Sequence, residues 1–240
     1  MKVAVIIPAA GASSRFGGKT KKIFESLKGR AVFLRSLELF VNREDVCQVQ
    51  LVGAEEDMET FKTRFAPNIG FMGVKLVRGG KDRTESVRNA LAQVSEEADY
   101  ICVHDAVRPC VSPLWIDEVF AAAEKHGAAL LAYPLHGTLK RVEGDFITQT
   151  LDRTGLWEAQ TPQVFRKGLL LAAYAHATAG ATDDAALVEA TGQKVAVVTG
   201  DPRNIKITTR RDLELASAVV DALPQPKPKK SGGPFDEAQW

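Results

Sequence analysis

The sequence contains few cysteines, no long apolar run and almost no excess charge, and each shortage excludes a class of protein. Its three cysteines are odd in number and lack metal-ligand spacing, so we expect reduced thiols and a reducing, cytoplasmic compartment. No apolar run is long enough to span a membrane, and the N-terminus lacks the pattern of a signal peptide. A net charge of +1 argues against a general nucleic-acid binder. We therefore expect no nucleic-acid partner and no membrane partner.

The sequence does contain apolar strand-like segments that alternate with helical ones. Hydrophobic residues make up 45% and charged residues 25% of the 240 residues, which is enough for a sizeable core. We expect strands at residues 2–7, 46–52, 74–77, 100–103, 128–133, 195–198 and 204–207. We expect helices at residues 30–41, 55–65, 83–94, 113–126, 167–178, 182–191 and 209–223. This alternation predicts an α/β fold with a doubly wound, mostly parallel sheet.

Capping signals place several of the helix boundaries. Ser112-Pro113 reads as an N-cap followed by a first helical residue, and Gly127 ends the same helix. Thr209 to Asp212 resembles a capping box. We expect Pro67 to end the helix at residues 55–65.

The alternation is interrupted between residues 136 and 165. Three extended segments, at residues 138–142, 146–151 and 157–164, follow one another with no helix between them. An extended insert on an α/β core is usually a lid, an arm or a dimer contact. We expect one domain over residues 1–223, with residues 136–165 as an extended β-arm. Residues 224–240 are rich in Pro, Lys and Gly and predict a disordered tail.

A turn of small residues follows the first strand. Pro8 to Gly18 lets backbone amides approach an anion closely, and Arg15 with the lysines at residues 19–22 could hold a polyphosphate. The turn lacks the glycine spacing of the dinucleotide fingerprint. Gly18-Lys19-Thr20 matches the end of a P-loop, but Ser13 occupies its first position. The alternative is a plain turn with solvated lysines.

Two later segments could complete a ligand site. Asp105 comes just past a buried strand, where a carboxylate could hold Mg²⁺, or could cap a turn with Arg108 as its ion-pair partner. Gly79-Gly80 opens a helix that contains Ser86, which suits a base edge or an anion, although a plain strand–helix junction explains it as well. His104 reads as a hydrogen-bonded structural histidine.

Six segments together carry a family resemblance. They are Pro8-Ala9-Ala10-Gly11 with Arg15 and Lys22, the run from His104 to Pro109, Asp152-Arg153, Gln160 to Gln163, Thr182-Asp183, and Asn204 to Thr208. In this order they resemble the 2-C-methyl-D-erythritol 4-phosphate cytidylyltransferases of the non-mevalonate isoprenoid pathway, over about residues 2–222. The ribitol 5-phosphate cytidylyltransferases share most of these motifs. Ala9-Ala10-Gly11 favours the erythritol enzymes.

The resemblance implies a Rossmann-like sheet of the nucleotidyltransferase A type, with CTP, a sugar-alcohol phosphate and Mg²⁺ as ligands. It also implies a homodimer joined through the β-arm. Residues expected to contact the cytidine are Ala9, Ala10, Gly11, Gly80 and Ser86. Arg15, Lys22 and Lys206 are expected to hold the CTP phosphates as catalytic residues.

Other residues are expected to bind the acceptor and the metal. Asp105 is expected to bind the metal and the acceptor, and Arg108 is expected to be a substrate-binding residue. Thr138 and Arg153 are expected to reach the acceptor phosphate of the neighbouring subunit. The chain departs from the usual family pattern at Gly137, at Lys81 and at the segment 21–24, where Lys-Lys-Ile-Phe replaces Pro-Lys-Gln-Tyr or a similar run.

The expected reaction is a direct in-line attack by an acceptor phosphate oxygen on the α-phosphorus of CTP. It suits a sequence with no Ser-His-Asp or Cys-His signature. Two other classes compete with it. One is a P-loop ATPase or kinase built on Gly18-Lys19-Thr20, and the other is a nucleotide-binding regulator without catalytic activity.

Overall fold

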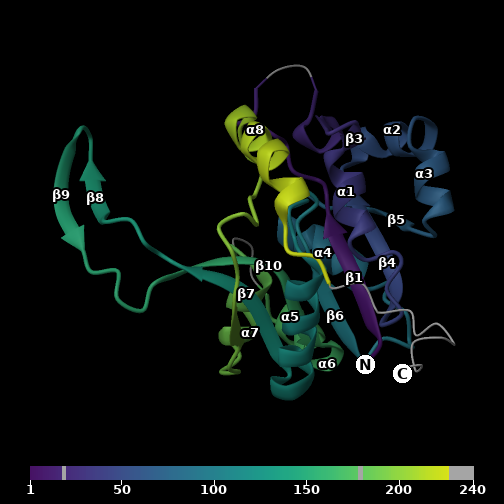
Figure 1. Ribbon diagram of the computed structural model, residues 1–240. Helices are drawn as coiled ribbons and strands as arrows, with labels where there is room; N and C mark the ends of the chain where they lie inside the picture. The colour runs from purple at the N-terminus through teal and green to yellow at the C-terminus, as the bar shows by residue number, and fades with distance from the viewer. Residues whose placement is uncertain (18–19, 178–180, 227–240) are drawn as a thin grey trace, which may run out of the picture.

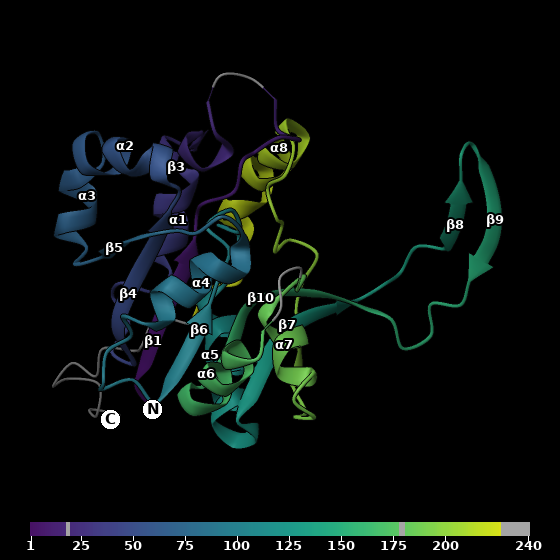
Figure 2. The ribbon, with the colours of Figure 1, turned by 180° about the vertical axis from the view of Figure 1, so that it is seen from behind.

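A seven-stranded sheet forms the centre of the protein in the computed structural model, which describes residues 1–17, 20–177 and 181–226 (Figures 1 and 2). Its strand order is β5-β4-β1-β6-β10-β7-β11. The strands are β1 (Val3–Pro8), β4 (Val46–Gly53), β5 (Lys75–Arg78), β6 (Tyr100–Val103), β7 (Ala128–Pro134), β10 (Trp157–Arg166) and β11 (Ala196–Thr199). Only β10 runs antiparallel to its neighbours. The predicted α/β fold with a mostly parallel sheet is confirmed.

Helices cover both faces of this sheet. They are α1 (Val32–Glu38), α2 (Met58–Thr63), α3 (Ala66–Phe71), α4 (Arg83–Leu91), α5 (Pro113–His126), α6 (Lys167–Ala175), α7 (Asp184–Glu189) and α8 (Arg210–Val219), with short 3₁₀ turns η1 (Lys22–Phe24), η2 (Glu55–Asp57) and η3 (Val220–Ala222). Side chains alternate across β1, so that Val5 and Ile7 join the core with α1 and α5, whereas Ile6 joins the core with α4 and α6. The strand that precedes the glycine turn is therefore fixed from both sides.

Several helix ends lie where the sequence placed them. Ser112 caps α5, accepting a hydrogen bond from the Leu114 amide at 3.2 Å, and Gly127 ends that helix with φ of +86°. Thr209 and Asp212 form the expected capping box of α8.

Two predicted elements are wrong. Pro67 was expected to end a helix, but it lies in the first turn of α3, where a residue without an amide hydrogen costs nothing. Residues 204–207 were expected to form a strand, yet they cross the end of the sheet without strand pairing. Their backbone bonds elsewhere instead: the Ile207 amide donates to the Val107 carbonyl at 2.8 Å, and Arg108 donates to the Asn204 carbonyl at 2.7 Å.

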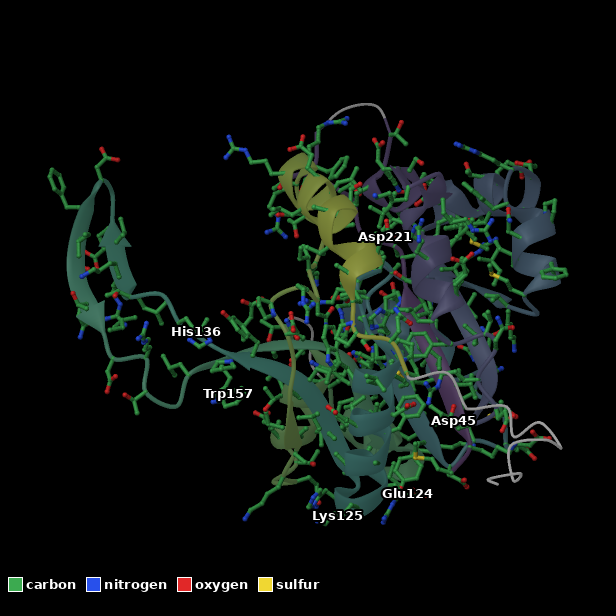
Figure 3. The ribbon with its side chains drawn as sticks, viewed as in Figure 1. Asp45, Glu124, Lys125, His136, Trp157 and Asp221 are labelled. Carbon is green, nitrogen blue, oxygen red and sulfur yellow. The ribbon has the colours of Figure 1, made fainter. Side chains whose placement is uncertain are left out.

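The extended insert divides into a projecting hairpin and a sheet strand. The strands β8 (Leu139–Glu143) and β9 (Phe146–Leu151) pair only with each other and lie well away from the central sheet (Figures 1 and 2). His136 and Trp157 mark the places where the chain leaves the sheet and returns to it (Figure 3). The part of β10 from Gln163 to Phe165 lies buried between β6 and β7, so the projecting arm is shorter than residues 136–165. The apolar residues at this end of β10 pack in the core of the domain and are not part of the arm.

The remaining elements are small. The strands β2 (Ser26–Leu27) and β3 (Arg30–Ala31) form a short hairpin before α1. Among the described helices, none combines the length and the apolar character that crossing a membrane requires. Most of the predicted C-terminal tail, from residue 227 onward, lies outside the described residues.

Candidate active site

A pocket of about 400 Å³ opens where the carboxyl ends of β1 and β6 lie side by side. The strand order reverses at this point, because β4 and β5 follow on one side of β1 and β6 lies on the other. Open α/β sheets bind ligands in such a crevice. The residues predicted from sequence that line it are Ala9, Ala10, Gly11, Arg15, Lys22, Gly80, Ser86, Asp105 and Lys206. The fold thus brings together segments that are distant in sequence.

Glycines allow the two loops of this pocket to pack closely. The Gly79 amide donates to the Gly53 carbonyl at 2.7 Å, and a Cβ atom on Gly79 would lie 3.1 Å from the Cβ atom of Ala10. A Cβ atom on Gly80 would overlap the side chain of Glu85. Ser86 fixes the loop by accepting from the Gly80 amide at 3.0 Å and donating to the Asp82 carbonyl at 2.7 Å. The pocket therefore has a rigid wall of backbone and small side chains.

Asp105 is a buried carboxylate within a group of cations. Its Oδ2 atom lies 2.8 Å from Nζ of Lys206 and 3.5 Å from Nε of Arg108. Burial alone would raise the pKa of Asp105, but the charges of Lys206, Arg83 and Arg108 outweigh it and hold that pKa well below its usual range. Asp105 is therefore negatively charged at neutral pH.

Arg15 and Lys22 add positive charge that no described acidic side chain neutralises by direct contact. Burial lowers the pKa of Lys22, and the nearby charges of Lys206 and Arg15 lower it further. Like charges that converge on an open pocket favour an anionic ligand. Lys21 does not join them, because its Nζ atom lies 2.7 Å from carboxylate oxygens of both Glu56 and Asp57. Lys21 does not line the pocket, Lys19 lies outside the described residues, and their predicted part in holding a polyphosphate remains a prediction.

A smaller cavity of about 210 Å³ adjoins the main pocket, and both are lined by Arg83, Asp105 and Lys206. Arg108, Thr161 and Thr182 also line it. Only 5% of Arg108 is exposed, and it lines this cavity but not the main pocket. A second anionic or hydroxyl-bearing group could sit in this cavity, beside the ligand of the main pocket.

His104 is a neutral hydrogen-bonded residue behind the site, as expected from the sequence. Nε2 of His104 lies 3.0 Å from the Arg108 carbonyl, which can only accept, so Nε2 carries the hydrogen of the neutral ring. Nδ1 is then an acceptor, and the Thr161 hydroxyl, which accepts the Asp105 amide at 3.1 Å, donates to it at 3.0 Å. Burial lowers the pKa of this imidazole to about 4. His104 therefore fixes the backbone of Asp105 and Arg108, and it carries no second, acidic proton at neutral pH.

Comparison with known proteins identifies the family. The family model described as 2-C-methyl-D-erythritol 4-phosphate cytidylyltransferase matches residues 3–222. An enzyme of that name from Rhodopirellula baltica is 41% identical over 231 residues, covering 91% of this chain and 95% of the relative. The chain belongs to the 2-C-methyl-D-erythritol 4-phosphate cytidylyltransferase family.

Solved structures of this cytidylyltransferase family share the fold. The enzyme from Francisella tularensis superimposes with a TM-score of 0.78 at 30% identity, covering 91% of this chain and 99% of that structure. The enzyme from Thermus thermophilus gives a TM-score of 0.77 at 33% identity, covering 92% and 100%. A bifunctional enzyme IspD/IspF from Rhodospirillum rubrum is 43% identical over 220 residues, which cover 57% of its length. The predicted Rossmann-like nucleotidyltransferase fold is therefore confirmed.

Two residues that the family resemblance assigned to the acceptor do not line these pockets. Thr138 precedes β8, and Arg153 lies between β9 and β10, both on the projecting arm. Neither lines the main pocket or the cavity beside it. Their predicted role in a neighbouring subunit remains a prediction.

Sequence reasoning on this cytidylyltransferase missed Arg83 and Thr161 as site residues. Arg83 lines both cavities and donates to the buried carboxylate of Asp184 at 2.6 Å. Burial opposes the charge of Arg83, but Asp184 outweighs this effect and raises the pKa of the guanidinium. Both residues lay inside segments singled out from the sequence. No local pattern in the sequence indicated the distant residue to which each of them bonds, which is Asp184 for Arg83 and His104 for Thr161.

The burial of His104 predicts a pH dependence of stability. The unfolded imidazole binds a proton below a pKa of 6.5, whereas the folded one does so only near 4. The stabilisation is therefore complete above pH 6.5 and is lost as the pH falls toward 4, with a slope of at most ~1.4 kcal/mol per pH unit. Denaturant unfolding between pH 6.5 and about 5, above the range where carboxylates protonate, measures this slope. His104→Gln should flatten it, and equal slopes in the two proteins would contradict the assignment.

Proposed function

We propose that this protein transfers CMP from CTP to 2-C-methyl-D-erythritol 4-phosphate, giving 4-diphosphocytidyl-2-C-methyl-D-erythritol and pyrophosphate for isoprenoid precursor biosynthesis. Family membership supports this reaction. The observation that carries it is the convergence of Arg15, Lys22 and Lys206 on a pocket walled by the glycine turn. A ribitol phosphate acceptor is not favoured, because the similar proteins carry the erythritol name.

The pocket divides between the two halves of CTP. The cytidine lies against the small side chains and amides of Ala9, Ala10, Gly11 and Gly80, with Ser86 fixing the second loop. The triphosphate lies among the cations Arg15, Lys22 and Lys206. Convergent donors of this kind neutralise phosphate charge and hold the nucleotide in one orientation.

The chemistry is a direct displacement at phosphorus. A lone pair on an acceptor phosphate oxygen forms a bond to the α-phosphorus, while the bond to the pyrophosphate oxygen breaks and that oxygen takes the electron pair. The acceptor phosphate has a second pKa near ~6, so it is mostly a dianion at neutral pH and needs no general base. The buried His104 agrees with this, because it lines neither cavity and so offers no base to a ligand. Charge neutralisation and positioning remain as the means of catalysis.

A divalent cation such as Mg²⁺ fits beside Asp105. The carboxylate is ionised, and Mg²⁺ is commonly held by one or two carboxylates together with substrate phosphates. When bound, the ion would neutralise phosphate charge that develops during transfer. In the described part of the chain, no three His, Cys, Asp or Glu side chains form an all-protein metal site, so the phosphates would supply the other ligands.

The acceptor occupies the smaller cavity, beside Arg108 and Thr161. Thr138 and Arg153 reach its phosphate from the arm of a second subunit in a homodimer. The hairpin supports this arrangement, since Phe146 is 78% exposed and Ile147 62% exposed, which a partner chain would cover. The free cysteines of the protein agree with a location in the reducing cytoplasm.

The substrate assignment predicts one productive pair of substrates. Pyrophosphate release should be fast with CTP and 2-C-methyl-D-erythritol 4-phosphate, and much slower when ATP, GTP or UTP replaces CTP. A faster reaction with ribitol 5-phosphate would transfer the assignment to that acceptor. Hydrolysis of ATP without any acceptor would favour the P-loop ATPase reading instead.

Each phosphate cation should be needed for turnover. Arg15→Ala, Lys22→Ala and Lys206→Ala should each lower kcat by ~10²–10³, the usual cost of losing one well-aimed donor. Lys62→Ala, which removes an exposed lysine of α2, serves as the charge-matched control and should keep normal turnover. Steady-state pyrophosphate release measures kcat, and unfolding curves check the fold. Near-normal kcat in the Lys22 variant would remove that residue from the site.

We predict that the arm binds the acceptor and not the nucleotide. Arg153→Ala is expected to raise the KM for the sugar-alcohol phosphate most, with the KM for CTP little changed, because its partner is the acceptor phosphate. Lys140→Ala on β8 is a control within the same arm, since its side chain already bonds Thr150 across the hairpin. An equal rise of both KM values in the Arg153 variant would count against this division of roles.

A further inference from the structure

Lys21 and Lys22 are adjacent in sequence, yet their side chains lie in different parts of the structure. Lys22 lines the nucleotide pocket, whereas Lys21 does not. Lys21 bonds both acids of η2, with Nζ at 2.7 Å from Oε1 of Glu56 and 2.7 Å from Oδ2 of Asp57. The two residues also differ in backbone conformation, because Lys21 is extended, with φ of −65° and ψ of 141°, whereas Lys22 begins η1.

The ion pairs of Lys21 differ from an ordinary surface pair. Asp57 is only 5% exposed, so the pair is partly shielded from water. Burial opposes the charge of Lys21, but its hydrogen bonds to Asp57 and Glu56 outweigh this effect and raise its pKa. Lys21 thus stays charged, and its charge is taken up by η2 instead of by a ligand.

These contacts fix the place where the glycine turn ends and η1 begins. The Lys21 carbonyl accepts the Phe24 amide at 2.9 Å, which opens η1. The Phe24 ring packs against Phe61 and Phe65, with ring centroids 5.3 and 5.5 Å apart. Lys22 therefore lies between two anchors on one surface, an ionic one at residue 21 and an aromatic one at residue 24.

We propose that Lys21 is a positioning residue for the nucleotide site, acting through its ion pairs with Glu56 and Asp57 to hold Lys22 in the pocket. The inference rests on the proposed function for the identity of the nucleotide, CTP. Lys22 needs such support, because burial and its cationic neighbours Lys206 and Arg15 all disfavour a charge at its position. An unanchored Lys22 would be free to turn away from the pocket when no phosphate is bound.

The test compares variants by CTP affinity, measured calorimetrically without acceptor, and by the KM for CTP. Lys21→Ala should weaken CTP binding about three- to tenfold, the range for a partly shielded ion pair, while the KM for the acceptor changes little. Glu56→Ala removes half of the anchor and should give a smaller loss in the same direction. Glu59→Ala, an exposed acid in the same segment, is the matched control and should bind CTP normally.

Lys21→Pro separates positioning from charge. The φ of −65° at Lys21 is the value that a proline ring imposes, and the Lys21 amide donates no hydrogen bond to a described residue. Proline should therefore fix the same backbone without the ion pair and restore most of the CTP affinity. Normal CTP binding by Lys21→Ala would overturn the proposal. Equally weak binding by the alanine and proline variants would also overturn it, because the ammonium group itself would then act on CTP.

A measurement without nucleotide keeps the two hypotheses apart. In Lys21→Ala, hydrogen exchange should become faster at the amides of Phe24 and Glu25, which bond the carbonyls of Lys21 and Lys22. If the protein binds CTP but transfers no CMP, or binds no CTP at all, the proposed function fails while this exchange measurement still decides the role of Lys21. Should Lys21→Ala not fold, Glu56→Ala carries the test, because Glu56 is a surface residue. Unchanged exchange in the folded variant would overturn the proposal.

Discussion

The ion pair between Asp105 and Lys206 is the interaction on which the rest of the site depends. It joins the end of β6 to a segment about a hundred residues later, which crosses the sheet without strand pairing. Because the carboxylate is buried, it would be costly without cations, and because three cations surround it, it remains charged. One buried negative charge therefore lies among Arg83, Arg108 and Lys206, of which Arg83 and Lys206 line the main pocket.

Support for this cluster comes from behind the sheet edge. His104 and Thr161 fix the Asp105 amide and the Arg108 carbonyl by a chain of hydrogen bonds in which each donor has one acceptor. Arg83 is fixed by the buried Asp184, which Tyr174 also contacts. Arg83 is thus oriented by groups that line neither of the two cavities. Such preorganisation means that the charges need not rearrange when phosphates enter.

Most of the sheet and much of the pocket could be predicted from the sequence, because they depend on local patterns. Strands such as β1 and β6 appear as apolar runs, and the residues just after them must lie at one edge of a parallel sheet. Pairs of distant charges could not be predicted in this way. Apart from the family motif, nothing in the sequence near Lys21 distinguishes it from Lys22, because the difference lies in the acids of η2. The place of β10 between β6 and β7 is likewise decided by long-range packing, and its antiparallel direction departs from the repeated pattern around it.

The groups that could have offered acid–base or covalent chemistry are withheld from the pocket by the same packing that builds it. Burial lowers the pKa of His104 to about 4, and burial raises the pKa of the Cys110 thiol to about 12, so neither an imidazolium acid nor a thiolate forms at neutral pH, and both ring nitrogens of His104 are already hydrogen-bonded within the protein. Cys102 lies within β6 and is fully buried. The pocket is lined instead by several cations, by backbone amides and by the two carboxylates Asp82 and Asp105. For a reaction in which a dianionic phosphate is already the nucleophile, the barrier lies in bringing two like-charged groups together. A site that gathers cations while its imidazole and thiols stay buried addresses that barrier directly. It also offers no general base that would activate water to attack the nucleotide.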